Sequence, residues 1–111
     1  MKNQKDVKVY IASPYTKGDM AQNVNFQMKI ADELINKGFI PFVPLYTHFQ
    51  HMFYPQSYET WLHIDFKWIE SCRALLRLGG ESPGADREVE YAKEKNIPVF
   101  YSLEELYEFF K

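Results

Sequence analysis

The chain has 111 residues and a net charge of −2, which predicts a single domain (1–111) and argues against the basic surface that nucleic-acid polymers require. Its one cysteine, Cys72, excludes a disulfide framework and a thiolate metal cluster, and we interpret it as a small core residue. No apolar run is long enough to span a membrane and no apolar signal region begins the chain, so a soluble cytoplasmic protein is expected.

Short β-branched and aromatic segments alternate with helical patterns along the chain. Strands are predicted at about 7–12, 39–43, 73–78 and 97–101, and helices at about 19–37, 57–71, 83–95 and 102–110. Pro41 either weakens the prediction of the second strand or places that strand near a sheet edge. The stretch 44–56 is predicted to be one long aromatic loop, which in a small domain is more often functional than a bare connector. The alternation predicts an α/β fold of three layers, with a parallel sheet of four to five strands between helices.

The spacing of apolar residues predicts the buried face of each helix. The predicted buried residues are Val24, Met28, Ala31 and Ile35 in the first helix, Trp61, Ile64, Trp68 and Cys72 in the second, Ala85, Val89 and Ala92 in the third, and Leu103, Leu106 and Phe110 in the last. Two acidic residues, Asp65 and Glu88, fall within these stripes. Glu90 and Glu94 project elsewhere and are predicted to be surface charges.

Asp65 and Glu88 are therefore predicted to point inward. A buried carboxylate is costly unless it is hydrogen-bonded, paired or left in a cleft. The two helices precede and follow the same predicted strand, so both acids can border one pocket, where two carboxyls have the makings of a nucleophile and an acid. The alternative is that each acid sits at the rim of its stripe, satisfied by water or a neighbour.

Tyr10, in the first strand, allows two interpretations as well. It can be an ordinary core aromatic, or its phenol can lie at the sheet end and donate a hydrogen bond to a carboxylate. The loop that follows this strand begins at Ser13 and brings hydroxyls and one lysine, Lys17.

The stretch 79–88 is typical of a strand-to-helix turn, with glycines, a hydroxyl, a proline and then a helix start. Such turns lie at the carboxyl ends of strands, where ligands bind in open α/β sheets. The free backbone N–H groups of the first helical turn suit a phosphate or another anion. Ser82 and Gly84 are the candidate contacts.

Three histidines, His48, His51 and His63, lack the ligand spacing and the carboxylate or cysteine partner of a zinc site, so no metal site is predicted. His48 lies in the predicted loop and is a candidate substrate contact.

Three separated segments, Val9–Ala12, Asp65–Ile69 and Ser82–Glu88, resemble the nucleoside 2-deoxyribosyltransferase family, whose superfamily includes the 2′-deoxynucleoside 5′-monophosphate N-glycosidases. The chain also resembles small uncharacterised bacterial and phage proteins related to them. The resemblance covers about residues 7–101 and implies a flavodoxin-like, Rossmann-like sandwich. It implies displacement at the anomeric carbon of a (deoxy)nucleoside, without a metal or organic cofactor, in a homo-oligomer.

The resemblance also implies roles for individual residues. Glu88 matches the nucleophilic glutamate, Asp65 matches an acid near the base, and Tyr10 matches a tyrosine that orients the nucleophile. Ser82 matches the position that reads the 5′ end of the sugar, where serine in place of an acid favours a 5′-phosphate. The chain departs from the pattern at Asp86, where the family often has a second glycine. A side chain there works against a close approach of the backbone to the sugar, and its negative charge works against a nearby phosphate unless Arg87 or Lys17 offsets it.

Three functions remain open from the sequence. The first is cleavage or transfer of the N-glycosidic bond of a nucleoside 5′-monophosphate, with hydrolysis and transfer undecided. The second is a non-catalytic nucleotide-binding or sensing module. The third is a partner-binding domain that uses the aromatic stretch 45–54 as its contact surface.

Overall fold

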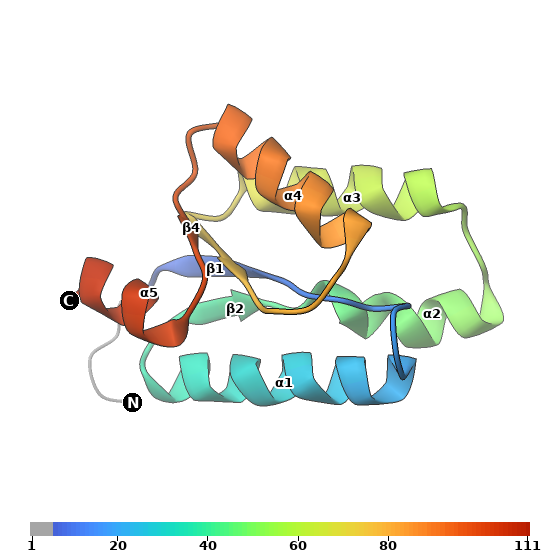
Figure 1. Ribbon diagram of the computed structural model, residues 1–111, viewed down its shortest axis with the longest axis horizontal. Coiled ribbons are helices and arrows are strands. Elements are labelled where there is room, and N and C mark those ends of the chain that lie inside the picture. The colour runs from blue at the N-terminus through green and yellow to red at the C-terminus, as the bar shows by residue number, and fades with distance from the viewer. Residues whose placement is uncertain (1–5) are drawn as a thin grey trace.

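The computed structural model describes residues 6–111 (Figure 1). In chain order the elements are β1 (Lys8–Ala12), α1 (Met20–Asn36), β2 (Ile40–Phe42), a short 3-10 helix η1 (Pro44–Tyr46), α2 (Thr47–Phe53), α3 (Tyr58–Glu70), β3 (Ala74–Arg77), α4 (Pro83–Glu94), β4 (Val99–Phe100) and α5 (Leu103–Phe109). The four strands form one parallel sheet in the order β2-β1-β3-β4. The predicted α/β fold with a parallel sheet is confirmed, and Pro41 lies on the edge strand β2 as expected.

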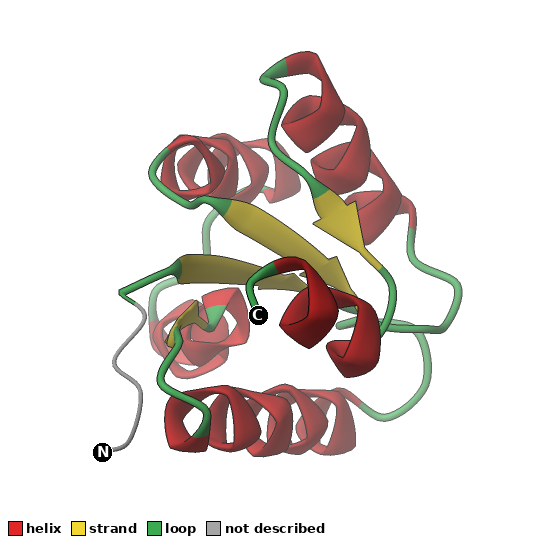
Figure 2. Ribbon diagram, turned by 90° about the vertical axis from the view of Figure 1, so that its left-hand side faces the viewer, coloured by secondary structure: helices red, strands yellow, loops and turns green. Residues whose placement is uncertain are grey.

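The side chains of the central strand β1 alternate between two hydrophobic clusters. Val9 and Ile11 belong to the cluster that α1 and α5 complete, whereas Tyr10 and Ala12 belong to the cluster that α3 and α4 complete. Figure 2 shows the resulting three layers, with the sheet between the two pairs of helices. Cys72 is buried in the second cluster, as predicted.

Helices α1, α3, α4 and α5 begin where the sequence indicates. In each of them the side chain of the residue before the first turn accepts a hydrogen bond from a backbone amide three residues later. These capping residues are Asp19, Ser57, Ser82 and Ser102. After α4 the chain turns at Asn96, whose φ of 60° is the left-handed conformation that asparagine tolerates.

The prediction of a loop over 44–56 is wrong, because the structure forms η1 and α2 there. Helix α2 buries none of its residues, and Phe49, Met52 and Phe53 are exposed. A helix without a buried face produces no apolar period, so the pattern that predicts the other helices is absent in this stretch.

Two predicted stripes are also partly wrong. In α1 the residues Met28 and Ile35 are exposed, and the buried face is Val24, Gln27, Ile30, Ala31 and Leu34. In α3 the residues Ile64 and Trp68 are exposed, and the buried residues are Leu62 and Ile69. Apolar residues surround α3, so more than one stripe fits its sequence; the ring of Trp68 stacks at 4.7 Å on Phe42 beside the sheet instead of entering the core.

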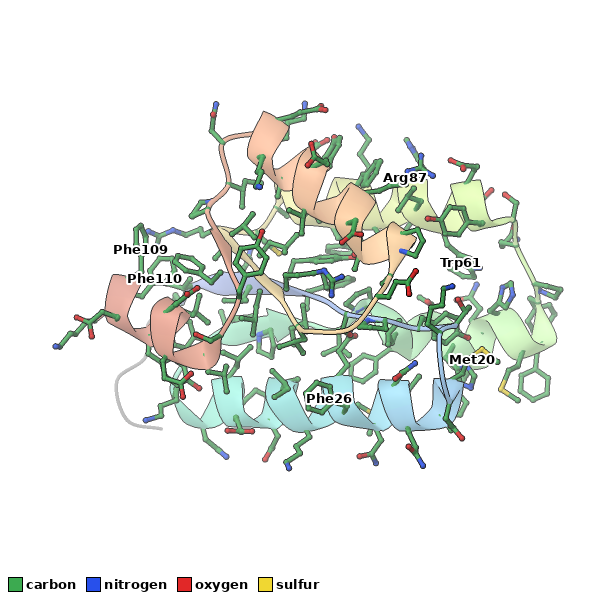
Figure 3. All side chains as sticks on the ribbon, in the orientation of Figure 1. Met20, Phe26, Trp61, Arg87, Phe109 and Phe110 are labelled. Carbon is green, nitrogen blue, oxygen red and sulfur yellow. The ribbon has the colours of Figure 1, made fainter. Side chains whose placement is uncertain are left out.

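The strand order reverses direction between β1 and β3, because the chain first crosses from β1 to β2 and then returns past β1 to reach β3. A crevice forms at such a switch point, outside the carboxyl ends of the two strands. Figure 3 shows Trp61 on this side and Phe109 and Phe110 of α5 at the other end of the molecule. Within residues 6–111 no helix combines the length and the apolar character that crossing a bilayer requires.

Candidate active site

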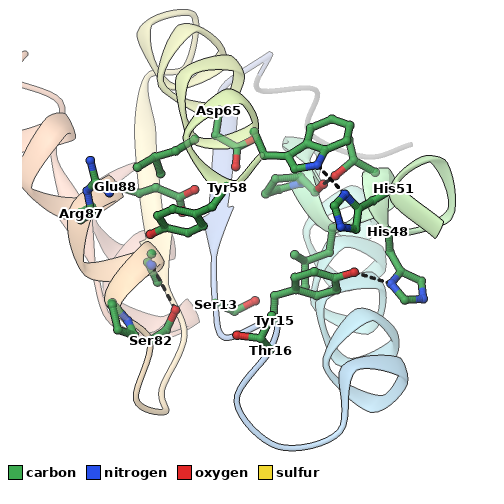
Figure 4. A pocket seen from close by; sticks show the side chains of 18 of the residues that line it. Ser13, Tyr15, Thr16, His48, His51, Tyr58, Asp65, Ser82, Arg87 and Glu88 are labelled. Carbon is green, nitrogen blue, oxygen red and sulfur yellow. Dashed lines mark hydrogen bonds between the residues drawn. The ribbon is translucent and has the colours of Figure 1, made fainter. Parts of the chain in front are cut away.

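A cavity of about 670 Å³ opens at the switch point, a volume typical of small-molecule sites (Figure 4). Gln27 of α1 lines it together with three segments, namely the loop after β1, the stretch from η1 to the middle of α3, and the start of α4 from Ser82 to Glu88. Six of the seven sequence-predicted site residues line this cavity, namely Ser13, His48, Asp65, Ser82, Gly84 and Glu88. The seventh, Tyr10, lies behind the wall and contacts Glu88.

Glu88 and Asp65 reach the cavity from two neighbouring helices. Glu88 follows Ala85 by one turn of α4 and is only 7% exposed. Asp65 lies between the buried residues Leu62 and Ile69 of α3, so it faces inward even though the predicted stripe of that helix is shifted. The structure therefore brings the two acids of the sequence prediction together.

The two carboxyls perturb each other strongly. Burial raises the pKa of Glu88 well above its ordinary value, and the neighbouring charge of Asp65 raises it further. Burial also raises the pKa of Asp65 to about 6, although hydrogen bonds from Glu88 and Tyr10 to its carboxylate oppose that rise. Because the pKa values of both carboxyls are raised and the two groups interact, they titrate as a pair, and one shared proton is favoured over two adjacent negative charges.

Tyr10 supports this pair from within the core. Its side chain is fully buried, and its hydroxyl donates a 2.8 Å hydrogen bond to Oε2 of Glu88. Burial together with the nearby Glu88 and Asp65 charges raises the pKa of the Tyr10 phenol well above its ordinary value, so the phenol stays protonated and acts as a donor. The ring of Phe42 stacks on Tyr10 at 5.7 Å and fixes its orientation.

Ser82 and Gly84 form the start of α4 at the cavity wall. The Ser82 hydroxyl accepts from the amide of Ala85 at 3.0 Å and caps the helix, which leaves its own proton available to donate. A side chain at Gly84 would meet the hydroxyl of Tyr58 at 3.3 Å, so the narrow space there suits glycine. The free amide end of the helix and the capping serine together can hold an anion.

Arg77 is a residue of this region that the sequence interpretation missed. It ends β3, is 9% exposed, and donates to the carbonyl oxygens of Leu78 and of Gly80, the latter at 2.8 Å. It also pairs with Asp86 at 3.1 Å, so the negative charge that distinguishes this chain from the family pattern is offset. The sequence signal for Arg77 was a basic residue inside an otherwise apolar strand.

Arg87 also lines the cavity, and it pairs with Glu59 of α3 at 3.1 Å instead of with Asp86. Its guanidinium lies over the ring of Tyr58 at 5.7 Å. These contacts join the first turn of α3 to the first turn of α4 across the mouth of the cavity.

Ser13 and His48 line the opposite wall through a buried network. Gln27 of α1 is fully buried and donates to the Ser13 hydroxyl at 2.8 Å, so the Ser13 proton is free to point to a ligand. The amide oxygen of Gln27 accepts from the backbone of Leu45, which ties η1 to this wall. The ring of His48 meets the Tyr15 hydroxyl at 2.5 Å. The sequence held one indication of this role, because Gln27 lies three residues after Val24 and four before Ala31, which is the spacing of the buried face of α1.

Among residues 6–111 no three His, Cys, Asp or Glu side chains gather as a metal site would require. The chemistry that the cavity offers is therefore described by its carboxyl pair, its phenol and its hydrogen-bond donors.

Comparison with known proteins identifies the family of this chain. A family model described as a domain of unknown function (DUF7768) matches residues 7–102. The chain belongs to the DUF7768 family. None of the curated proteins matches it.

A solved structure resembles this DUF7768 domain closely enough to identify its fold. It is the 2-deoxyribosyltransferase of the psychrotolerant bacterium Bacillus psychrosaccharolyticus, with a TM-score of 0.61 and 19% identity over 84% of this chain and 69% of that chain. At this identity the similarity establishes the fold, and it confirms the predicted resemblance to the 2-deoxyribosyltransferases.

Proposed function

We propose that this protein cleaves or transfers the N-glycosidic bond of a (deoxy)nucleoside 5′-monophosphate, with Glu88 as the nucleophile. The observation that carries the proposal is the buried Glu88 carboxyl, held by Tyr10 on its inner side and facing Asp65 in one cavity. A carboxyl pair that shares one proton supplies both a nucleophile and an acid, which glycosyl transfer requires. The shared fold with a 2-deoxyribosyltransferase supports the choice of substrate class.

In the first step a carboxylate oxygen of Glu88 attacks C1′ of the sugar. The bond from C1′ to the base nitrogen breaks, and its electron pair leaves with the base. Asp65 gives the shared proton to the departing base, so the base leaves as a neutral molecule and a glycosyl ester remains on Glu88. Substrate binding must first move the proton from Glu88 to Asp65, which one hydrogen bond between the two carboxyls permits.

In the second step water or another base attacks C1′ of the ester. Asp65, now ionised, accepts the proton of the attacking group, and the electron pair of the ester bond returns to Glu88. Water gives hydrolysis and a second base gives transfer. No metal or organic cofactor takes part in this proposal.

The 5′ end of the substrate is assigned to the turn before α4. Ser82 donates its hydroxyl proton, Gly84 gives close access to the backbone, and the helix N-terminus favours the negative charge of a phosphate. The Arg77–Asp86 ion pair supports this assignment, because it offsets the negative charge of Asp86, which would otherwise repel a phosphate. Ser13 and His48 are the proposed contacts on the opposite wall.

Incubation with a panel of deoxynucleoside and ribonucleoside monophosphates, followed by chromatography of the free bases, tests the proposal. We expect base release that falls about a thousandfold or more in Glu88→Gln, which keeps an acceptor for Tyr10. Glu90→Gln, an exposed change on the same helix, serves as the matched control. Base release that survives in Glu88→Gln would rule out the proposed nucleophile.

A partner-binding role is the second candidate, because α2 exposes Phe49, Met52 and Phe53, followed by Tyr54, each at least 60% exposed. Binding of monophosphates without turnover would instead favour a sensing module.

We also propose a homo-oligomer, in line with the implied family. Light scattering that shows a monomer would contradict this assembly.

A further inference from the structure

His51 of α2 has a fixed hydrogen-bonding state at the cavity wall. Its Nδ1 lies 2.8 Å from Nε1 of Trp61 and 3.3 Å from the backbone nitrogen of Gln56 (Figure 4). The indole N–H and the backbone amide are donors only. Nδ1 of His51 therefore accepts, and the neutral imidazole must carry its hydrogen on Nε2.

This conclusion does not depend on which ring nitrogen occupies which position. If the imidazole were turned over, the nitrogen facing Trp61 would still have to be the acceptor, and the other nitrogen would still carry the hydrogen. Within residues 6–111 no acceptor pairs with that second N–H, while the His51 side chain lines the cavity and is only half-buried. The cavity wall thus presents an unused donor of fixed polarity.

The position of this donor follows from α3. Trp61, which holds His51, precedes Asp65 by one helical turn, a rise of about 6 Å. In the proposed reaction Asp65 protonates the departing base, so the glycosidic edge of the base lies at Asp65. The edge that lies across the ring from the glycosidic nitrogen carries the C6 substituent of a purine or the C4 substituent of a pyrimidine. A base oriented along α3 from Asp65 would present that edge to His51, which lines the same cavity.

We propose that His51, held by Trp61 as an Nε2–H donor, recognises the exocyclic oxygen of the base. The site then takes 6-oxopurine and 4-oxopyrimidine nucleotides in preference to their amino counterparts. An oxo group accepts a hydrogen bond from Nε2–H of His51. An amino group is itself a donor, so it cannot accept this hydrogen bond. This inference rests on the proposed function and specifies its substrate class.

Two matched substrate pairs test the inference. Deoxyinosine and deoxyadenosine monophosphates differ at C6 between oxo and amino groups, and deoxyuridine and deoxycytidine monophosphates differ in the same way at C4. We expect kcat/KM to favour the oxo member of each pair by about tenfold or more. Dissociation constants measured by calorimetry on Glu88→Gln, which binds without turning over, should show the same preference.

Variants separate the role of His51 from its structural contacts. The amide of His51→Gln can accept through its oxygen or donate through its nitrogen. The ratio of kcat/KM between the oxo and amino substrates should therefore fall to near unity. Trp61→Phe keeps an aromatic ring but removes the shorter of the two hydrogen bonds to Nδ1 and leaves only the 3.3 Å contact from the Gln56 amide. The tautomer is then held less firmly, so the preference should fall as well. His63→Gln, an exposed histidine of α3 outside the cavity, is the control and should leave the preference unchanged.

The outcomes distinguish the inference from the proposed function. Equal turnover of both members of each pair, or a preference unchanged in both His51→Gln and Trp61→Phe, would overturn the inference and leave the glycosidase proposal standing. Absence of both binding and base release with all four nucleotides would overturn the two together. The nitrogen chemical shifts of the His51 ring in the parent protein give a direct check, because a hydrogen on the ring nitrogen that faces Trp61, on either tautomer or on a ring protonated at both nitrogens, would refute the assignment.

Discussion

The hydroxyl of Tyr10 donates a 2.8 Å hydrogen bond to Oε2 of Glu88, although 78 positions separate the two residues in the chain. The donor belongs to the central strand β1, and the acceptor belongs to α4, so the bond joins the most buried layer of the fold to the cavity wall. One carboxyl oxygen of Glu88 is thereby fixed by the core, and the side chain cannot rotate freely.

The first prediction concerns Tyr10→Phe. The Tyr10 hydrogen bond lowers the pKa of Glu88 against the effect of burial, so its loss raises that pKa further. The acidic limb of the pH dependence of kcat/KM should move to higher pH, and activity at neutral pH should fall roughly tenfold to hundredfold, the value of a hydrogen bond to a charged group. Pre-steady-state or steady-state base release across pH 5–9 gives the measurement, with Tyr101→Phe, an exposed tyrosine, as control. A limb that stays in place would show that Tyr10 does not govern Glu88.

The second prediction concerns the stability of the protein as pH changes. The pKa of Asp65 is raised to about 6 by burial, above its value in the unfolded chain. The folded state therefore binds more protons between about pH 4 and pH 6, and stability falls as pH rises through that window. Asp65→Asn should remove this loss and make the protein more stable at pH 7–8 by roughly 2 kcal/mol.

Urea unfolding at several pH values measures this effect. Glu90→Gln removes an exposed carboxylate of α4 and should leave the pH dependence as it is. An Asp65→Asn protein that is less stable than the parent at pH 8 would contradict the assignment of Asp65 as a strained carboxylate.

The third prediction concerns Arg77 and Asp86. Arg77→Met leaves the Asp86 charge without its partner, which should weaken binding of nucleoside monophosphates by about tenfold while binding of the uncharged nucleosides changes less. Adding Asp86→Asn to Arg77→Met should recover part of the lost affinity, because the repelling charge is then absent. Calorimetric titration of both variants with nucleoside monophosphates and with nucleosides measures these affinities. An equal loss of affinity for both kinds of ligand would mean that Arg77 acts only through folding of the turn.

The fourth prediction concerns the two glycines after β3. Gly80 has a φ of 107°, and a Cβ there would lie 2.8 Å from Cγ of Pro14, whereas a Cβ at Gly79 meets nothing within 4 Å. Gly80→Ala should lower the free energy of unfolding by about 1–3 kcal/mol. Gly79→Ala should change it little and serves as the matched control. Thermal unfolding of both variants gives the comparison, and equal melting temperatures would exclude close packing of the two loops.

The sequence predicted the sheet because the strands alternate with capped helices. Each of the four capping residues lies where a polar side chain precedes an apolar period, and β1 carries apolar residues on both of its faces. The inward direction of Glu88 followed from Ala85, Val89 and Ala92, all of which are buried. These features are local, and local patterns are what a sequence displays directly.

Other features depend on contacts that a single sequence does not display. The stripe of α3 was misplaced because its apolar residues surround the helix, and the packing of Leu62 and Ile69 on the sheet selected one face. The inward direction of Asp65 was nevertheless predicted correctly, because Asp65 lies beside both the predicted stripe and the buried face that the structure shows. The pairing of Arg77 with Asp86 and of Trp61 with His51 joins different elements, so only the folded chain reveals it.

Helix α2 supplies His48 and His51 to the cavity but buries none of its own residues. An element with so few core contacts can open locally at small free-energy expense, so its amides should exchange with solvent sooner than those of β1 or α4. Mutations in α2 can then alter which ligand fits without unfolding the sheet that holds Glu88 and Tyr10.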